Sequence, residues 1–363
     1  MKLGFGLMRL PRSGDDRIDI EQVKAMVDRF IAAGGTYFDT AYVYDGSEEA
    51  IRKALVERYP RNAYTLATKC NAWLGCHSRE EARQQIQTSL VRTGLQYFDY
   101  YLLHSIRDSN VQIYDDYALW DHIRDLKAAG LVKRCGFSFH DQPALLDELL
   151  TKHPEVDFVQ LQINYADWNN PDVASRENYE TARRHGKPIV VMEPVKGGIL
   201  ADLPAAFSEP FQTYAPDASL ASWAIRYVAS LDGILAVLSG MSSIEQMDDN
   251  LSYMKEFSPL SAEEQSLVRE VQRRLGESGT IPCTSCKYCM PGCPRGIAIP
   301  KIFGAYNLYQ IYRRMDLARR NYMMLTQTSS PASSCVQCGQ CEGACPQHLP
   351  IINNLKKAAE LFE

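Results

Sequence analysis

The chain has 363 residues, enough for one large domain and a smaller one, and 45% of its residues are hydrophobic, as in ordinary globular proteins. Its formal net charge of -5 excludes the broad basic surface that nucleic-acid binding needs, so we expect no nucleic-acid partner. The N-terminus lacks the apolar stretch of a signal peptide, and no apolar run reaches transmembrane length. We therefore expect a cytoplasmic protein with no membrane partner.

Eight short apolar or β-branched runs recur over the first 240 residues, and most are followed by a segment with helical periodicity. The runs cover residues 3–5, 36–39, 64–69, 98–104, 132–138, 158–164, 188–193 and 234–240. The helical segments cover residues 20–33, 48–59, 78–93, 117–129, 142–152, 175–185 and 219–230. Alternating strands and helices predict a parallel sheet, and eight such units in about 250 residues are typical of a closed (β/α)8 barrel.

The sequence also marks helix boundaries and the end of the barrel. Ser78 precedes two glutamates and is a candidate N-cap. A capping sequence that starts at Ser261 predicts a last helix to about Leu275, and residues 276–282 have the composition of a linker. We therefore expect a barrel domain over residues 1–276 and a second domain over residues 277–363.

In a (β/α)8 barrel the chemistry takes place at the carboxyl ends of the strands, so the residue that ends each predicted strand is a candidate site residue. The second, third and fourth predicted strands end in Asp39, Lys69 and His104, and Tyr44 follows on the loop after Asp39. Each residue alone has an ordinary structural interpretation, such as packing or helix capping. Their shared position at strand ends favours a catalytic set.

These four residue types suit the reduction of a carbonyl group. A carbonyl carbon that accepts hydride leaves negative charge on the oxygen, and a phenol beside it can donate the proton. The ordinary pKa of a phenol is about 10, and a neighbouring cation lowers it. We therefore expect Lys69 to lower the pKa of Tyr44, Asp39 to hold the Lys69 ammonium, and His104 to orient the substrate oxygen by a hydrogen bond.

Five short motifs extend this set: YFDTAYVY, which contains Asp39 and Tyr44; ATK, which ends in Lys69; YYLLH, which ends in His104; GFS at residues 136–138; and QLQINY at residues 160–165. On these motifs, about the first 258 residues resemble the aldo-keto reductases. The resemblance implies a (β/α)8 barrel without a Rossmann domain, a nicotinamide cofactor, and a small aldehyde, ketone or alcohol as substrate. It also implies that Asp39, Tyr44, Lys69 and His104 are the catalytic tetrad of the family.

The same resemblance implies contacts to the cofactor. Ser138 and Gln162 match positions that hold the nicotinamide carboxamide, although Phe139 replaces the usual neighbouring asparagine. Met192 stands where the family often stacks a tyrosine on the nicotinamide. The segment after the eighth strand matches the phosphate-binding loop and leads into a helix N-terminus, where free amides favour an anion. Its candidate cofactor residues are Gly240, Ser242, Ser243, Gln246 and Asn250.

The choice between NADP and NAD stays open, because the basic residues that commonly bind the 2′-phosphate are absent from this segment. Gln246 stands where an arginine is common, and Lys196 is a candidate substitute. Trp73 and Trp168 fall on loops, where they either line a substrate pocket or pack beneath the loops.

Eight of the eleven cysteines form two copies of one pattern near the C-terminal end. Each copy reads C-x2-C-x2-C-x3-C-P, in which three thiolates on one loop bind one 4Fe-4S cluster and the fourth binds the other cluster. The pattern predicts two ligand sets: Cys283, Cys286, Cys289 and Cys345 for one cluster, and Cys335, Cys338, Cys341 and Cys293 for the second. Paired zinc sites and a disulfide framework are the weaker alternatives. The remaining cysteines are expected to be buried apolar residues: Cys70, Cys76 and Cys135.

The tail resembles the two-cluster ferredoxins over about residues 280–352, but 41 residues separate Cys293 from Cys335. Residues 302–325 in this insert are rich in apolar and basic side chains at helical spacing. We expect this insert to be helical and to pack the clusters against the barrel. Its arginines at positions 313, 314, 319 and 320 form either a solvated face or a docking patch for an acidic electron carrier.

These patterns together predict an oxidoreductase that interconverts a carbonyl and an alcohol by hydride transfer, with a fused two-cluster module that exchanges electrons with an external carrier. A hydride carries two electrons whereas a cluster takes one, so a flavin is a further candidate cofactor, although the sequence has no dedicated flavin motif. Two alternatives are a nicotinamide-dependent reductase whose clusters are structural and a flavin-assisted electron-transfer reductase. A third is a redox-sensing or electron-carrier protein with an inactive barrel.

Overall fold

The structure is a computed structural model that describes residues 1–14 and 16–363. The chain forms two compact units, which are described separately here. The first consists of Met1–Asn169, Ala174–Val195 and Ala221–Ser261. The second consists of Asn170–Val173, Lys196–Leu220 and Ala262–Glu363, so it combines the cysteine-rich tail with a segment that follows the seventh strand.

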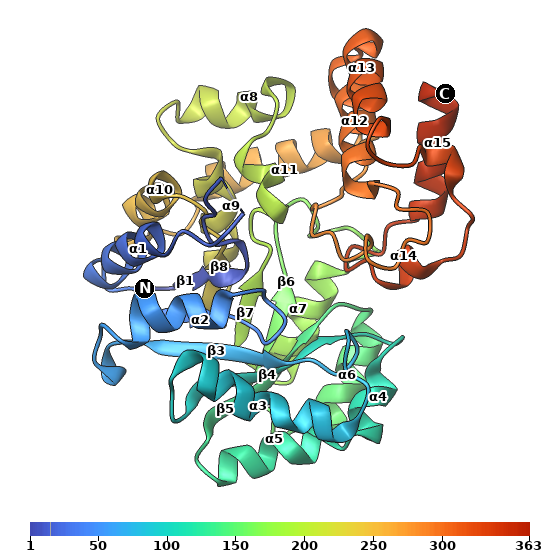
Figure 1. The fold of residues 1–363 in the computed structure, drawn as a ribbon. Helices are drawn as coiled ribbons and strands as arrows, with labels where there is room; N and C mark the ends of the chain where they lie inside the picture. The colour runs from blue at the N-terminus through green and yellow to red at the C-terminus, as the bar shows by residue number, and fades with distance from the viewer. Residues whose placement is uncertain (15) are drawn as a thin grey trace. The chain divides into compact units, whose positions relative to one another are not determined.

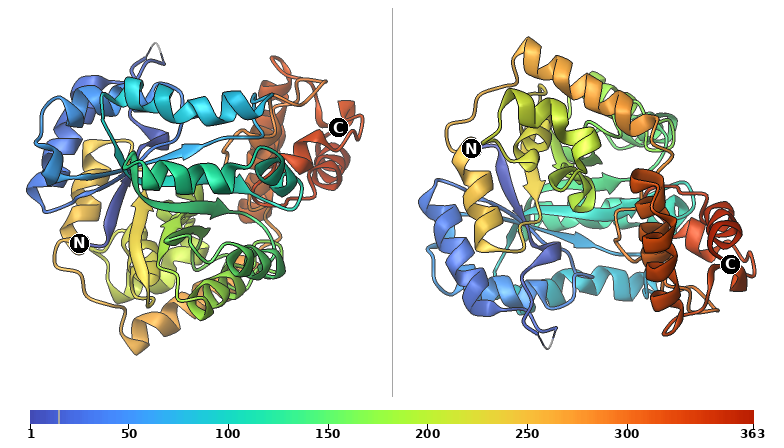
Figure 2. Two further views of the ribbon diagram at one scale, coloured as in Figure 1. Left: turned by 90° about the horizontal axis from the view of Figure 1, so that it is seen from below. Right: turned by 90° about the horizontal axis from the view of Figure 1, so that it is seen from above.

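Eight parallel strands form a closed barrel in the first unit, with each strand hydrogen-bonded to its neighbours in chain order (Figure 1). They are β1 (Leu3–Gly6), β2 (Tyr37–Asp39), β3 (Thr65–Cys70), β4 (Phe98–Ile106), β5 (Val132–Phe139), β6 (Phe158–Gln162), β7 (Ile189–Met192) and β8 (Ile234–Ser239). Strands β1 and β8 pair and close the barrel, and they lie side by side in Figure 2. The predicted (β/α)8 fold is therefore confirmed, and every predicted strand ends within two residues of its observed end.

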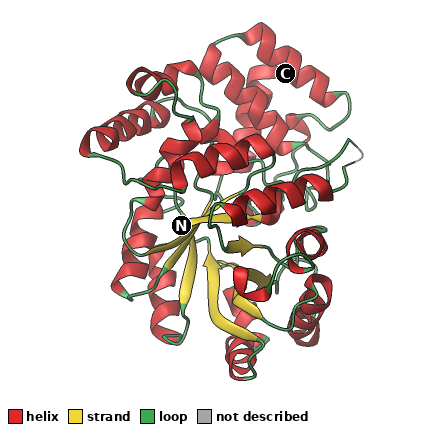
Figure 3. Ribbon diagram, turned by 90° about the vertical axis from the view of Figure 1, so that its left-hand side faces the viewer, coloured by secondary structure: helices red, strands yellow, loops and turns green. Residues whose placement is uncertain are grey.

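Helices surround the strands of this barrel (Figure 3). The α-helices of the first unit are α1 (Ile20–Ala32), α2 (Ser47–Ile51), α3 (Arg79–Thr93), α4 (Val111–Asp116), α5 (Leu119–Ala128), α6 (Pro143–Lys152), α7 (Ser175–Arg184), α9 (Leu220–Ala229) and α10 (Ile244–Met254). Its shorter helical turns are η1 (Leu7–Arg9), η2 (Arg52–Val56) and η3 (Arg61–Ala63). Ser78 caps α3 as predicted, because its Oγ accepts a hydrogen bond from the Glu81 amide at 3.1 Å.

Two predicted boundaries in the barrel were wrong. The segment 48–59 is not one regular α-helix, because α2 passes at Ile51 into the π-helical turn η2, which ends at Val56. Strand β4 does not end at His104 but continues to Ile106, with an irregular register between Leu103 and Ile106. Ser105, within this irregular stretch, has φ = 60°. The strand is therefore locally distorted just after His104 but does not end there.

The barrel unit has two layers of apolar packing. An outer layer lies between strands and helices and includes Phe5, Phe30 and Phe38. A smaller cluster fills the barrel interior, and its buried members are Tyr37, Ala67, Tyr100, Leu102, Phe158, Val190, Ala236 and Leu238. Gly136 on β5 makes room for this cluster, because a β-carbon there would lie 2.4 Å from the Phe158 carbonyl oxygen.

The second unit is helical. Its elements are η4 (Lys196–Ala201), α8 (Ala205–Tyr214), α11 (Ala262–Gly276), α12 (Ile299–Tyr312), α13 (Met315–Thr326), η5 (Ala332–Ser334), α14 (Gln340–Gly343) and α15 (Ile351–Phe362). The insert over 302–325 is helical as predicted, and it forms two helices, because the chain turns at Arg313, where φ is 54°, between α12 and α13. In the described part of the chain, no helix is both long and apolar enough to cross a membrane.

Candidate active site and metal centres

The alternation of side chains along the strands brings the predicted site residues to one end of the barrel interior. Successive residues of a strand point to opposite faces, so residues two positions apart share a face. Asp39 follows Tyr37 in this way, Lys69 follows Ala67, and His104 follows Leu102. The polar residues therefore continue the rows that fill the barrel interior and lie toward the carboxyl ends of β2, β3 and β4.

Asp39 and Lys69 form a buried ion pair. Lys69 Nζ lies 2.5 Å from Asp39 Oδ1 and donates a second hydrogen bond to the Thr40 carbonyl at 2.7 Å. The other Asp39 oxygen accepts a hydrogen bond from Gln160 Nε2 at 3.3 Å. Burial raises the pKa of Asp39 and lowers that of Lys69, and the ion pair opposes both shifts.

Tyr44 and His104 lie beside this pair. The ring centroids of Tyr44 and His104 are 5.8 Å apart in an edge-to-face arrangement, and Lys69 Nζ lies 5.0 Å from the Tyr44 ring centroid. All four members of the predicted set therefore meet in the barrel unit. Tyr44 is partly exposed, whereas the other three are buried.

The predicted lowering of the Tyr44 pKa was wrong. Its pKa is raised, first because burial disfavours the phenolate and then because the carboxylates of Asp39 and Glu193 repel it. Arg9 opposes this shift. The Lys69 ammonium faces the ring and is already bound to Asp39, so Tyr44 is held as a neutral phenol that retains its proton.

His104 is held neutral. Burial, followed by the positive charges of Lys69 and Arg107, lowers the pKa of His104 well below its ordinary value. Tyr114 donates a hydrogen bond to the His104 carbonyl, which fixes the backbone at this point. Among the described residues, His104 Nδ1 is buried and has no hydrogen-bond partner. A neutral imidazole in this position can donate one hydrogen bond to a substrate oxygen.

The predicted carboxamide contacts also lie at strand ends. Ser138 Oγ on β5 accepts a hydrogen bond from the Ser105 amide at 2.7 Å, which leaves its hydroxyl proton to donate. Gln162 on β6 donates to Asp167 at 3.1 Å, and Met192 ends β7 with a partly exposed side chain. A hydroxyl, an amide and an apolar side chain suit the carboxamide and the ring of a nicotinamide, so these residues fit that group.

Several polar groups of the loop after β8 and of α10 form hydrogen bonds with one another or with the end of β8. Gln246 Oε1 accepts from the Ser242 amide at 2.7 Å, and the Gln246 amide donates at 3.3 Å to the Oγ of Ser243, the N-cap of α10. Asn250 Nδ2 donates to Ser239 Oγ at 2.6 Å and so fastens α10 to the end of β8. The expectation of free amides is therefore wrong for Ser242 and Gln246.

Other predicted residues lie outside this set. Lys196 is buried at the start of η4 in the second unit, and its role in cofactor binding stays a prediction. Trp73 and Trp168 are partly buried and pack against the outer core of the barrel unit. The three cysteines outside the repeated pattern are buried as predicted, and burial raises the pKa of each thiol: Cys70, Cys76 and Cys135.

Three residues near the site were not predicted from sequence. Gln160 supports Asp39, and its alternation with Gln162 on β6 was a usable signal. Glu193 follows β7 with φ = 56°, and its carboxylate faces Arg9, with Glu193 Oε1 3.8 Å from Arg9 Nη2. No local pattern links two residues so far apart in the chain.

The first predicted cluster set comes together in the second unit. Burial raises the pKa of Cys283 to about 11 and that of Cys289 to about 12, and the neighbouring thiols of Cys286 and Cys345 add to both shifts. Cys345 belongs to the second copy of the motif, so the chain folds to bring it beside the first copy. This is the crossed arrangement that the spacing predicts.

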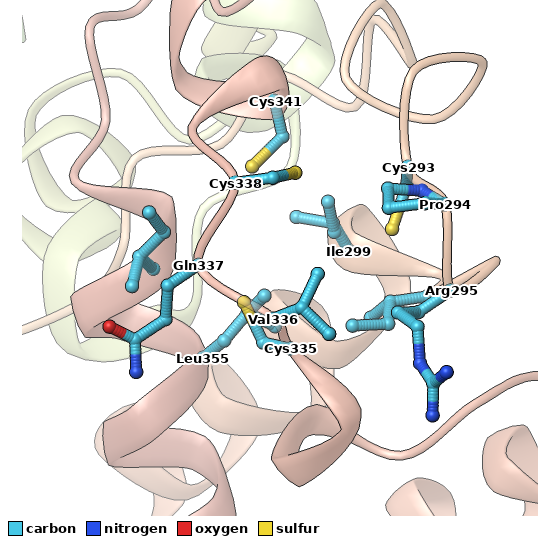
Figure 4. A pocket seen from close by; sticks show the side chains of 12 residues that line it. Cys293, Pro294, Arg295, Ile299, Cys335, Val336, Gln337, Cys338, Cys341 and Leu355 are labelled. Carbon is cyan, nitrogen blue, oxygen red and sulfur yellow. The ribbon is translucent and has the colours of Figure 1, made fainter.

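The second set lines one pocket, which is shown in Figure 4. Its four cysteines are Cys293, Cys335, Cys338 and Cys341. The pocket also has apolar walls, including Ile299 and Leu355. Within residues 1–14 and 16–363, no three His, Cys, Asp or Glu side chains stand close enough to hold a single metal ion. Cysteine thiolates are the usual ligands of 4Fe-4S clusters, so the four thiols that line this pocket fit such a group.

The family model for the aldo/keto reductase family matches residues 2–273, and the model for a 4Fe-4S dicluster domain matches residues 282–349. The chain belongs to the aldo/keto reductase family. It is thus an NAD(P)-dependent oxidoreductase with a C-terminal 4Fe-4S domain, as the sequence resemblance predicted.

Known relatives of this aldo/keto reductase share its barrel at low identity. An uncharacterised oxidoreductase of Bacillus subtilis is 24% identical over 283 residues, which cover 69% of this chain and 86% of that protein. L-galactose dehydrogenase of Arabidopsis thaliana is 24% identical over 289 residues, which cover 73% and 88%. The holo form of an aldo-keto reductase from Bacillus halodurans superimposes with a TM-score of 0.61 at 25% identity, and the match covers 74% of this chain and 91% of that structure.

Proposed function

We propose that this protein interconverts a small aldehyde or ketone and the corresponding alcohol by hydride transfer with NADP or NAD. The observation that carries the proposal is the meeting of Tyr44, Lys69, Asp39 and His104 at one end of the barrel interior, within reach of one small molecule. A solved relative from Klebsiella pneumoniae was crystallised with NADPH, and this likeness in fold supports a nicotinamide dinucleotide here.

When bound, the nicotinamide supplies a hydride to the carbonyl carbon or accepts one from the alcohol carbon. In the reductive direction, the hydride brings the electron pair that forms the new C–H bond, and the carbonyl oxygen takes one proton. Tyr44 donates that proton, since its raised pKa keeps the phenol protonated at neutral pH. Its partial exposure lets solvent return the proton. The neutral His104 orients the oxygen by a hydrogen bond.

The Asp39–Lys69 pair positions the proton donor and sets the charge around it. The Lys69 ammonium lies 5.0 Å from the Tyr44 ring centroid, where it favours the phenolate that forms after proton transfer. Asp39 and the Thr40 carbonyl fix this ammonium by two hydrogen bonds. Ser138 and Gln162 are the residues that would hold the carboxamide of a bound cofactor, and Met192 would pack against its ring.

We further propose that the C-terminal domain holds two 4Fe-4S clusters on the two crossed thiol sets, with the domain boundary between residues 276 and 277. Bound clusters pass single electrons, which supports exchange with an external electron carrier in the cytoplasm. Cys338 is exposed, so one edge of the second set is open to such a carrier. A flavin would reconcile two-electron and one-electron steps and is the second candidate cofactor of this scheme.

The proton-donor role is tested with Tyr44→Phe and the matched control Tyr42→Phe. Tyr42 lies two residues away, and its ring packs on the Arg92 guanidinium at 4.6 Å. With a panel of small aldehydes and NADPH or NADH, we expect Tyr44→Phe to lower kcat by about a hundredfold or more while dinucleotide affinity is kept. Tyr42→Phe should retain turnover. Undiminished turnover in Tyr44→Phe contradicts the proposed function.

The role of the clusters is tested on protein reconstituted under anaerobic conditions. Its absorption spectrum and iron content report the number of clusters and any bound flavin. A Cys338→Ser, Cys341→Ser protein is then compared with wild type in turnover driven by a reduced one-electron carrier and in turnover driven by NADPH. Loss of only the carrier-driven reaction supports electron exchange, whereas unchanged carrier-driven turnover shows that the clusters are structural.

A further inference from the structure

The two cysteine loops of the second unit share a backbone turn but differ in exposure. The residue before the second cysteine has a positive φ in both loops, 55° at Ser285 and 58° at Gln337. The residue one position earlier is buried in the first loop, where Thr284 is 2% exposed, but in the second loop Val336 is 55% exposed. The polar side chain is therefore covered and the apolar one faces solvent, which reverses the ordinary preference.

The thiols of the two sets differ in the same way. Cys338 in the second set is exposed, whereas the four thiols of the first set are partly or fully buried. Electrons move between proteins only over short distances, so a protein that exchanges them with this domain binds beside the exposed set. The pocket of the second set is therefore the place to look for a docking surface.

Apolar and cationic side chains surround this pocket. In Figure 4 Pro294 and Arg295 lie on one side of it, across from Cys338. Arg295 is exposed, and within the described residues it has no ion-pair partner. Met290 is 38% exposed, and its carbonyl accepts a hydrogen bond from the Cys293 amide at 3.1 Å, so its turn leads into the pocket wall.

The charge of this domain differs in sign from that of the chain. Residues 282–349 contain seven Lys or Arg and two Asp or Glu, although the whole chain has a net charge of -5. Both acids are bonded within the domain, since Asp316 pairs with Arg314 at 2.8 Å and Glu342 accepts from the Ile352 amide at 2.8 Å. A cluster held by four thiolates is itself anionic, so cations at its edge are what attract an acidic partner.

The arginines of the insert suit such a partner less well. Arg314 is occupied by Asp316, and Arg319 donates to the Phe362 carbonyl at 3.2 Å. Arg320 is exposed but does not line the pocket of the second set. It therefore provides a control that has the same charge as Arg295 at a different place in the domain.

We propose that a carrier face, consisting of Met290, Pro294, Arg295, Val336 and Cys338, binds a small acidic protein with a one-electron centre. Val336 and Met290 supply apolar contacts, and Arg295 pairs with a carboxylate of the partner. One electron passes from the reduced partner to the cluster on the second set, and no bond or proton changes place. This inference rests on the proposed electron exchange and adds the class of partner and the surface that receives it.

The test is calorimetric titration of the anaerobically reconstituted full chain with an oxidised, acidic plant-type ferredoxin at about 0.05 M and 0.5 M salt. Arg295→Glu should weaken binding by about tenfold or more at low salt, and the difference should shrink at high salt. Arg320→Glu changes the net charge equally and should weaken binding by no more than about threefold. Val336→Ser should weaken binding by about threefold or more at both salt concentrations, because it removes an apolar contact.

Three results would overturn the carrier face. They are unchanged binding by Arg295→Glu, an equal loss in Arg320→Glu, and a wild-type affinity that does not fall with salt. The iron content of each variant is measured, and Arg295→Gln carries the same prediction with a smaller loss if Arg295→Glu loses iron.

Reduced methyl viologen separates this inference from the proposed function, because it is a small molecule that needs no protein docking surface. Wild-type clusters that methyl viologen reduces, but that the ferredoxin neither binds nor reduces, contradict only the acidic partner. Clusters that neither reductant reduces contradict the proposed electron exchange itself.

Discussion

Removing Lys69 should destabilise the barrel strongly, because it leaves the Asp39 carboxylate buried without its cation. In Lys69→Met the volume of the side chain is nearly kept, but among the described residues Asp39 retains only the Gln160 side-chain hydrogen bond at 3.3 Å. The Thr40 carbonyl also loses its bond from Lys69. Breaking a buried ion pair from one side costs about 3–5 kcal/mol, and we expect the free energy of unfolding to fall by that amount.

The double variant Asp39→Asn, Lys69→Met separates charge from packing. It has no buried charge at this position, so it should be more stable than Lys69→Met, and the two substitutions should be strongly non-additive. Lys127→Met is the surface control, because Lys127 pairs with Asp157 at 2.6 Å but both side chains are partly exposed. That control should cost less than about 1 kcal/mol.

Urea unfolding followed by tryptophan fluorescence is the assay. The four tryptophans, Trp73, Trp120, Trp168 and Trp223, all belong to the first unit, so the signal reports the barrel and not the cluster domain. A Lys69→Met protein that loses less than about 1 kcal/mol refutes the buried-pair account. Additive effects of the two single substitutions would refute it as well.

Three further predictions concern pH, a tight contact and the cluster ligands. Because the pKa of Tyr44 is raised, the phenol stays protonated at high pH, and the reduction rate should not fall as pH rises through about 10. A reduction rate that falls below that pH contradicts the raised pKa. Gly197→Ala would bring a β-carbon within 2.5 Å of the Thr284 carbonyl oxygen, which lies in the first cysteine loop. The control is Gly198→Ala, where φ is also positive but no atom lies within 4 Å of the added β-carbon. The iron content of the protein should fall more in Gly197→Ala than in this control. Cys293→Ala should remove one of two clusters, and a protein that keeps both by iron analysis and EPR contradicts the crossed ligand sets.

Much of the fold followed from the sequence because short apolar or β-branched runs and amphipathic helical segments alternate regularly. The same alternation placed Asp39, Lys69 and His104 at strand ends, although β4 runs on to Ile106. The distortion at Ser105 permits this extension. The pattern of hydrophobic residues does not predict which serine adopts a positive φ. The break at Arg313 was missed for the same reason, since no glycine or proline stands there.

Long-range contacts between side chains were beyond sequence reasoning. Arg9 and Glu193 meet only because the barrel closes β1 against β8 and places β7 beside it, and nothing in either local segment signals the pair. The direction of the pKa shift of Tyr44 also depends on the burial of the phenol and on the carboxylates near it. The grouping of the thiols was predictable, since the motif spacing places the fourth cysteine of each copy with the first three of the other. The assignment of these thiols as cluster ligands stays a prediction.

The most direct test of the central claim is the transfer of deuterium from NADPH or NADH that is deuterated at the transferable position of the nicotinamide ring. The protein is incubated with a small aldehyde, and the alcohol product is analysed by mass spectrometry and NMR. We predict one deuterium on the carbinol carbon of each product molecule, and about a hundredfold less of this labelled product from Tyr44→Phe in a reaction of equal duration. Oxidation of the dinucleotide with no deuterium in the product would contradict direct hydride transfer in the barrel.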